Sequence, residues 1–197
     1  MTRPGWLMLG LGLIASAGCL AAQPEGDRYD PTFRKYAKRY FGVGFDWRVF
    51  KAQGLAESGL AAGARSGVGA RGVMQLMPST FREIQSSNPE FRSVDDPEWN
   101  IAAGIYYDRQ QWRLWKGDVA DADHHRFMFG SYNAGRVPIL TAQRVAREER
   151  LDPLLWSSVS QVAPRVPRWR HRETLGYVAK IREHLARLDA KGRIVRK

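Results

Sequence analysis

One acidic side chain at the end of a predicted helix is the residue of this 197-residue chain best suited to do chemistry. Glu57 closes a predicted helix that begins at Asp46, and five glycines follow between Gly59 and Gly72. Such glycine density favours tight turns, so a loop is expected beside the carboxyl. A carboxyl that burial keeps protonated near neutral pH can deliver a proton to a leaving oxygen. Taken alone, an acidic residue at a helix end is more often a solvated charge, so this reading depends on the surrounding motifs.

Further polar and aromatic residues recur in short motifs along the chain. In order, the motifs are Glu57-Ser58-Gly59; Ser66 with Gly69-Ala70-Arg71-Gly72-Val73-Met74-Gln75-Leu76-Met77-Pro78; Asp96-Pro97-Glu98-Trp99-Asn100-Ile101 with Gly104 and Tyr107; Tyr132-Asn133-Ala134-Gly135; and Glu173-Thr174 with Tyr177-Val178 and Ile181. Each motif is weak evidence by itself, whereas their order and spacing together are specific. Phe50, Met74 and Tyr177 are candidates for an apolar wall around the Glu57 carboxyl.

This series resembles the catalytic domain of soluble lytic transglycosylases, which is related to goose-type lysozyme, over about residues 45–188. The flanking segments 46–48 and 144–156 look most like the catalytic half of the membrane-bound lytic transglycosylase F type. The resemblance implies an all-α, lysozyme-like single domain that cleaves the β-1,4 bond between N-acetylmuramic acid and N-acetylglucosamine in peptidoglycan. It further implies that the muramic acid 6-hydroxyl attacks its own anomeric carbon and leaves a 1,6-anhydro end.

The same resemblance assigns roles to individual residues. It makes Glu57 the catalytic acid and base, and it places the Tyr177 hydroxyl near that carboxyl. The residues that it assigns to substrate binding are Ser66, Gln75, Met77, Tyr132, Asn133, Glu173 and Tyr177. Gly72 is expected to let the backbone approach the sugar closely. Glu98 and Asn100 are interpreted as helix-start residues outside the site. No cofactor is implied, and the pair His124-His125 has no matching metal-ligand spacing, so a surface loop is expected there.

Helical periodicity accounts for most of the remaining chain. The predicted helices lie at about 33–40, 46–57, from a capping box of Thr80 and Glu83, from Asp96-Pro97 to near Gly117, at 125–134, at 138–150, from Asp152-Pro153 into Val159, and at about 175–188. No stretch alternates apolar and polar residues, so the domain is expected to be predominantly helical. The tryptophans at 99, 112, 115, 156 and 169 are expected to complete the core more than to stack on sugars.

The N-terminus favours export of the chain. Arg3 precedes an apolar run that passes into small residues, which is typical of a secretion signal over residues 1–22. Cys19, the only cysteine, resembles a lipoprotein processing site, although Ser16 stands where leucine is usual, and lipidation and ordinary cleavage stay open. The expected divisions are 23–44 as a tether and N-terminal helix, 45–190 as the catalytic domain and 191–197 as a basic tail. A periplasmic protein is expected, anchored to the outer membrane if Cys19 carries lipid.

The net charge of +11 favours a polyanionic neighbour, whether nucleic acid, anionic lipid or cell wall. The export signal and the lack of recognition motifs disfavour nucleic acid, which leaves peptidoglycan glycan strands as the expected partner. Two alternatives stay open: a lysozyme-type hydrolase, and a peptidoglycan-binding scaffold of low activity within an envelope-spanning machine. The sequence does not decide between endo and exo cleavage, nor does it identify a protein partner.

Overall fold

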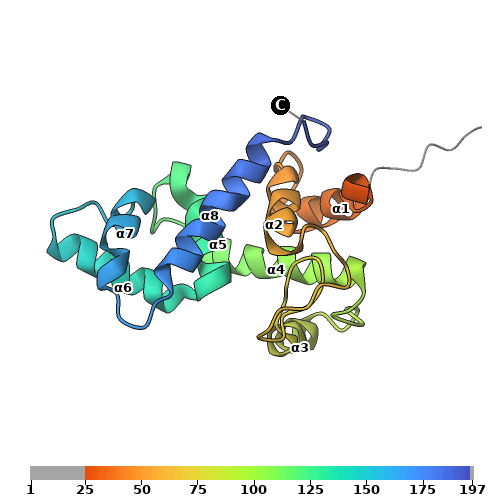
Figure 1. The fold of residues 1–197 in the computed structure, drawn as a ribbon, viewed down its shortest axis with the longest axis horizontal. Helices are drawn as coiled ribbons and strands as arrows, with labels where there is room; N and C mark the ends of the chain where they lie inside the picture. The colour runs from red at the N-terminus through yellow and green to blue at the C-terminus, as the bar shows by residue number, and fades with distance from the viewer. Residues whose placement is uncertain (1–24, 196–197) are drawn as a thin grey trace, which may run out of the picture.

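The computed structural model describes residues 25–195, which form eight α-helices and three short 3-10 helices without a β-strand (Figure 1). The α-helices are α1 (Asp30–Phe41), α2 (Arg48–Ser58), α3 (Pro78–Ser87), α4 (Pro97–Leu114), α5 (His124–Ala134), α6 (Arg136–Glu148), α7 (Trp156–Val162) and α8 (His171–Ala186), and the 3-10 helices are η1 (Glu25–Asp27), η2 (Asp121–Asp123) and η3 (Ala163–Arg165). The prediction of an all-α domain is therefore confirmed over this range. No helix within residues 25–195 has the length and apolar character needed to cross a membrane. The predicted signal segment 1–22 and Cys19 lie outside the described residues.

Helix α4 runs through the middle of the molecule and carries the core. Helices α1 and α5 pack along it, while α8 crosses the domain and packs against α2 (Figure 1). Ile101 and Ile105 of α4 are fully buried, as expected for residues one helical turn apart on an inward face. Gly104 lies on the same helix, where an added Cβ would come within 2.8 Å of the Met74 side chain. Glycine at this position thus lets the loop before α3 pack directly onto α4.

The sequence predicts side-chain caps at the starts of α3 and α4, and only the cap of α4 is observed. The side chain of Asp96 accepts hydrogen bonds from the backbone N–H groups of Glu98 and Trp99 at 2.8 and 3.2 Å, so the predicted start of α4 is confirmed. That helix ends at Leu114, before the predicted end near Gly117. The predicted capping box of Thr80 is wrong, because α3 already begins at Pro78 without a side-chain cap. Proline fits the first turn of a helix, where its missing N–H costs no hydrogen bond.

The later helices also differ from prediction at their starts. Helix α6 begins at Arg136 and not at Pro138, directly after Gly135 with its positive φ of 77°. The segment at Asp152 forms a turn instead of a helix start, and α7 begins only at Trp156. The backbone N–H of Trp156 donates to the Asp123 carboxylate at 2.8 Å, so this helix start is capped from a distant part of the chain.

Aromatic side chains fill the space between α4, α5 and α7. Trp115, Trp156 and Trp169 are buried, while Trp99 and Trp112 pack against the core, which confirms the core interpretation. The prediction of a surface loop at His124 is wrong, because His124 begins α5 and is buried. Its ring stacks on that of Trp112 with a centroid distance of 3.5 Å. This stacking on a partly buried tryptophan explains why His124 does not lie in a surface loop.

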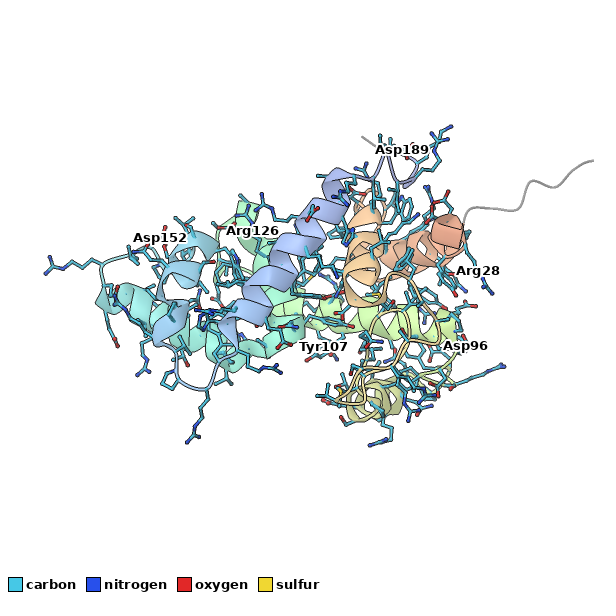
Figure 2. All side chains as sticks on the ribbon, in the orientation of Figure 1. Arg28, Asp96, Tyr107, Arg126, Asp152 and Asp189 are labelled. Atoms are coloured by element: carbon cyan, nitrogen blue, oxygen red, sulfur yellow. The ribbon has the colours of Figure 1, made fainter. Side chains whose placement is uncertain are left out.

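The segment after α8 returns to α2 at the end of the molecule that carries α1. Asp189 lies there (Figure 2), and its carbonyl accepts a hydrogen bond from Arg48 of α2 at 3.2 Å. The carbonyl of Gly192 accepts a hydrogen bond from Lys51 at 2.8 Å. Lys51 is fully buried and also pairs with Asp27 and Asp30 at 2.9 and 2.6 Å. The expected basic tail is therefore tied to the domain at Gly192, which is buried, while residues 193–195 are exposed.

Candidate active site

The C-terminal end of α2 carries Glu57. Gly59 ends this helix with a left-handed φ of 65°, and its N–H donates to the Leu55 carbonyl at 3.1 Å. Glycine accepts this conformation without the penalty that a Cβ would bring. The chain then turns into the glycine-rich loop directly after Ala56 and Glu57, the residues of α2 that form hydrogen bonds with α8. Glu57 keeps a partly exposed side chain, which leaves it accessible to a ligand.

A tyrosine from the last helix holds the Glu57 carboxyl. The Tyr177 hydroxyl, on α8, donates a hydrogen bond to Glu57 Oε1 at 2.6 Å. The loss of hydration in this environment raises the pKa of Glu57 to about 7, against the opposing effects of the Tyr177 hydrogen bond and the nearby charge of Lys180. Lys180 is itself fixed by a hydrogen bond to the Ala56 carbonyl at 2.9 Å. At neutral pH a substantial fraction of Glu57 is therefore protonated and able to act as a general acid.

The apolar wall predicted around Glu57 is only partly correct. Tyr177 is buried and contacts the carboxyl directly. Phe50 is also buried, but its ring packs against Phe41 and Phe45 at centroid distances of 4.9 and 5.6 Å. Phe50 therefore belongs to an aromatic cluster of the core, and helical spacing alone could not separate these two kinds of burial.

The glycine-rich loop between α2 and α3 is held in one shape by its own polar groups. Ser66 accepts a hydrogen bond on Oγ from the Ala70 N–H at 2.9 Å. Gln75 has a positive φ of 46° and donates from Nε2 to the carbonyl of Gly72 at 2.9 Å. Ser66 and Gln75 therefore stabilise the loop, and both side chains remain partly exposed. Met77, the last residue before α3, is exposed.

Asn100 fastens this loop to α4, a role that its interpretation as a helix-start residue missed. It is fully buried, accepts a hydrogen bond from the Met74 N–H at 2.7 Å and donates to the Arg71 carbonyl at 2.9 Å. Gly72 lies directly against it, and a Cβ at Gly72 would fall 2.5 Å from Asn100 Nδ2. The absence of a side chain at Gly72 thus allows Asn100 to pack directly against the loop.

Tyr132 of α5 also forms a hydrogen bond with this loop. Its hydroxyl donates to the Met74 carbonyl at 2.8 Å, and its ring meets that of Tyr107 edge to face at 5.2 Å. Burial, and to a smaller extent the charge of Glu57, raise the pKa of Tyr132 well above its usual value, so the hydroxyl stays neutral. Met74 itself is fully buried, as its core interpretation predicts. Tyr132 therefore holds the loop in place beside the Glu57 carboxyl.

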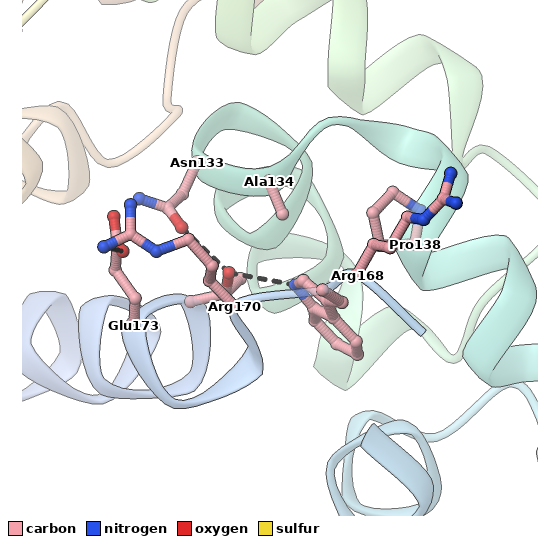
Figure 3. Close-up of a pocket in the computed structure, with 8 residues that line it drawn as sticks. Asn133, Ala134, Pro138, Arg168, Arg170 and Glu173 are labelled. Atoms are coloured by element: carbon pink, nitrogen blue, oxygen red, sulfur yellow. Dashed lines mark hydrogen bonds and ion pairs between the residues drawn. The ribbon is translucent and has the colours of Figure 1, made fainter. Parts of the chain in front are cut away.

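Asn133 and Glu173 line a separate hollow of about 210 Å³ near the start of α8 (Figure 3). The Thr174 hydroxyl donates to Asn133 Oδ1 at 2.9 Å and accepts from the Trp169 indole N–H at 3.1 Å, which are the bonds drawn in the figure. Arg170 lies beside Asn133 and Glu173, and its guanidinium is 3.1 Å from the Glu173 carboxylate. Glu173 precedes Tyr177 by one helical turn, so the hollow lies next to the Glu57 site along α8.

Two further polar residues near Glu57 were not predicted. Gln53 and Asp108 are fully buried, and Gln53 Nε2 donates to Asp108 Oδ1 at 3.4 Å. Burial raises the pKa of Asp108 well above its usual range. A signal existed in the sequence, since Asp108 falls on the same helical face as Ile101 and Ile105. No group of three or more His, Cys, Asp or Glu side chains that could hold a metal ion occurs within the described range.

Comparisons with known proteins place this arrangement in a family. The family model described as the transglycosylase SLT domain matches residues 32–153. The membrane-bound lytic murein transglycosylase F of Stutzerimonas stutzeri is 32% identical over 152 residues, which are 76% of this chain and 30% of that protein. The Vibrio cholerae protein of the same name is 30% identical over 139 residues, or 71% of this chain and 24% of that protein. The chain thus spans less than a third of the length of these relatives.

Solved structures agree with the fold. The 70 kDa soluble lytic transglycosylase of Escherichia coli aligns with a TM-score of 0.59 and 28% identity, covering 78% of this chain and 22% of that one. An inactive mutant of the lytic transglycosylase Slt from Pseudomonas aeruginosa aligns with a TM-score of 0.59 and 21% identity, covering 85% of this chain and 26% of that one. The fold is therefore the lysozyme-like fold of these enzymes. By both the family model and its relatives, this chain belongs to the transglycosylase SLT domain family.

Proposed function

We propose that this protein is a peptidoglycan lytic transglycosylase that cleaves the β-1,4 bond between N-acetylmuramic acid and N-acetylglucosamine. One observation carries the proposal. Glu57 is a partly exposed carboxyl with its pKa raised to about 7, and the Tyr177 hydroxyl fixes its orientation at 2.6 Å. A carboxyl of this kind is still protonated in a substantial fraction of molecules near neutral pH, as general acid catalysis of glycoside cleavage requires.

In the first step, protonated Glu57 transfers its proton to the glycosidic oxygen while the bond from that oxygen to the muramic acid anomeric carbon breaks. The Glu57 carboxylate then accepts the proton of the 6-hydroxyl of the same sugar, whose oxygen bonds to the anomeric carbon and forms the 1,6-anhydro ring. Glu57 ends protonated, so the cycle balances without water. The attack is intramolecular and benefits from a high effective concentration.

The position of Asp108 supports this route over hydrolysis. Glycoside hydrolases commonly use a second carboxylate to activate water or to attack the sugar. Asp108 is a second carboxyl near Glu57, but it is fully buried and contacts Gln53. A carboxyl enclosed in the core is poorly placed to activate a water molecule at a bound sugar.

The proposed substrate-binding residues divide into two groups along the site. Ser66, Gln75 and Met77 belong to the loop beside Glu57 and remain at least partly exposed. Asn133 and Glu173 line the hollow one helical turn away from Tyr177. In this proposal the loop binds the sugars next to the cleaved bond and the hollow binds a more distant part of the strand, while Tyr132 supports the loop from behind.

The proposal includes export to the periplasm through residues 1–22, with Cys19 as the point of lipid attachment and outer-membrane anchoring. The order of basic, apolar and small residues supports export. Intact-mass measurement of the membrane-bound protein tests the lipid. An added acyl mass that disappears in Cys19→Ala supports it, and an unmodified mass with cleavage near Ala21 removes it.

The activity is tested on purified protein with isolated peptidoglycan and mass spectrometry of the released fragments. Fragments with 1,6-anhydro-muramic ends, lighter than hydrolysed ends by one water, are expected from the wild type and not from Glu57→Gln. Hydrated reducing ends would show a lysozyme-type hydrolase instead. If the wild type releases nothing, but both proteins sediment with peptidoglycan, the chain is a binding scaffold.

A further inference from the structure

Asp108 and Gln53 form a buried polar pair that the proposed reaction does not use. Both side chains are fully buried, and only one hydrogen bond joins them, from Gln53 Nε2 to Asp108 Oδ1 at 3.4 Å. The two other oxygens, Gln53 Oε1 and Asp108 Oδ2, are also buried and have no hydrogen-bond partner among residues 25–195. A buried oxygen without a hydrogen bond lowers the stability of the folded state, so the lack of a partner for both of these oxygens requires a physical explanation.

No neighbouring donor within residues 25–195 reaches Gln53 Oε1 or Asp108 Oδ2, and two of the hydroxyls near Asp108 donate elsewhere. The Tyr132 hydroxyl donates to the Met74 carbonyl, and the Tyr177 hydroxyl donates to Glu57. Lys180, the cation whose charge acts on Glu57, donates to the carbonyl of Ala56. A proton on the pair itself would supply the donor that these two oxygens lack.

The charges around Asp108 disfavour its ionised form. The titratable groups that face it are Glu57 from α2, Tyr107 from its own helix α4, Tyr132 from α5 and Tyr177 from α8. Each of these groups is either neutral or anionic, and the charge of Glu57 adds to the effect of burial in raising the pKa of Asp108. A buried carboxylate without a cation is strongly disfavoured.

We propose that Asp108 is protonated on Oδ2 in the folded protein and donates this proton to Gln53 Oε1. Together with the bond from Gln53 Nε2 to Asp108 Oδ1, this closes a ring of two hydrogen bonds between a carboxylic acid and an amide. Both unpaired oxygens are then satisfied and no charge is buried.

The ring joins α4 to α2 at the residue one helical turn before Glu57. Asp108 is thus a positioning residue, which fixes the helix that carries Glu57 without adding a negative charge beside it. The role of Asp108 in positioning Glu57 for catalysis rests on the proposed function, whereas the protonation of Asp108 does not.

The test compares Asp108→Asn with its parent, both in a Glu57→Gln background, so that neither activity nor the titration of Glu57 contributes. A carboxyl that is protonated when folded and ionised when unfolded makes the unfolding equilibrium constant rise about tenfold per pH unit above about pH 4. The asparagine side chain of the variant cannot ionise, and its amide can form the same ring with Gln53. Urea unfolding between about pH 5 and pH 7 should therefore show a ratio of the two constants that rises about 100-fold. A constant ratio would overturn the proposal, because Asp108 would then be ionised in the folded protein.

Two further measurements address folding and the partner. If Asp108→Asn does not fold, the infrared spectrum of the folded Glu57→Gln protein at neutral pH should still contain the carbonyl band of a protonated carboxyl, and its absence would count against the proposal. Gln53→Leu, Asp108→Leu and the double variant identify the acceptor. The double variant should be less destabilised than the sum of the single variants, because it leaves no polar group unpaired, whereas additive effects would exclude the ring.

Discussion

Replacing Tyr177 with phenylalanine tests the coupling between Tyr177 and the proposed catalytic carboxyl. The Tyr177 hydroxyl donates to Glu57 Oε1 at 2.6 Å and favours its ionised form, so its removal raises the pKa of Glu57 above about 7. A hydrogen bond to a charged group contributes about 1.5–3 kcal/mol. At about 1.4 kcal/mol per pKa unit, the shift is about one to two units upward.

The assay is the pH dependence of peptidoglycan cleavage measured as kcat/KM. Because the first step needs protonated Glu57, the wild-type rate should fall above about pH 7, and that fall should begin at a higher pH in Tyr177→Phe. The plateau should also be lower, by about tenfold, because the carboxyl loses its fixed orientation. Tyr132→Phe is the matched control, since its hydroxyl donates to Met74 and not to Glu57. Tyr177→Phe would refute the reasoning if its kcat/KM began to fall at the same pH as that of the wild type, or at a lower pH.

Three further substitutions test the stability of the site and its scaffold. Glu57→Gln should be more stable than the wild type, by a difference that grows to roughly 3 kcal/mol as the pH rises from about 4.5 to about 7. The reason is that a carboxyl with a raised pKa destabilises the folded state once the same carboxyl ionises in the unfolded chain. Urea titrations at several pH values measure this difference, and a difference that does not change with pH would contradict the prediction. Gly72→Ala should cost about 2 kcal/mol or more through its positive φ and its contact with Asn100, whereas Gly63→Ala, with open space around it, should cost far less in the same thermal unfolding experiment. Lys51→Met should cost about 3–5 kcal/mol by leaving two carboxylates without their buried cation, and a loss below about 1 kcal/mol would show that this cation is dispensable.

Local patterns in the sequence located the helices well and their ends less well. Asp96 caps α4 as its sequence context predicts, because the hydrogen bonds of a cap lie within three residues of one another. The start of α7 was missed because the Trp156 N–H donates to Asp123, 33 residues earlier in the chain. Helical spacing also could not separate Phe50, which packs among core aromatic rings, from Tyr177, which contacts the Glu57 carboxyl.

The sequence by itself determined an all-α chain with a single candidate carboxyl at a helix end beside a glycine-rich loop, and its ordered motifs indicated the family. Only the tertiary structure decided the environment of that carboxyl. Tyr177 lies 120 residues from Glu57 in the chain, and the burial that raises the pKa of Glu57 arises only when α8 packs against α2. Asp108 and Asn100 likewise read as ordinary polar residues until packing buries them. Desolvation and hydrogen bonds between distant segments depend on the folded arrangement, and short-range sequence patterns do not contain that information.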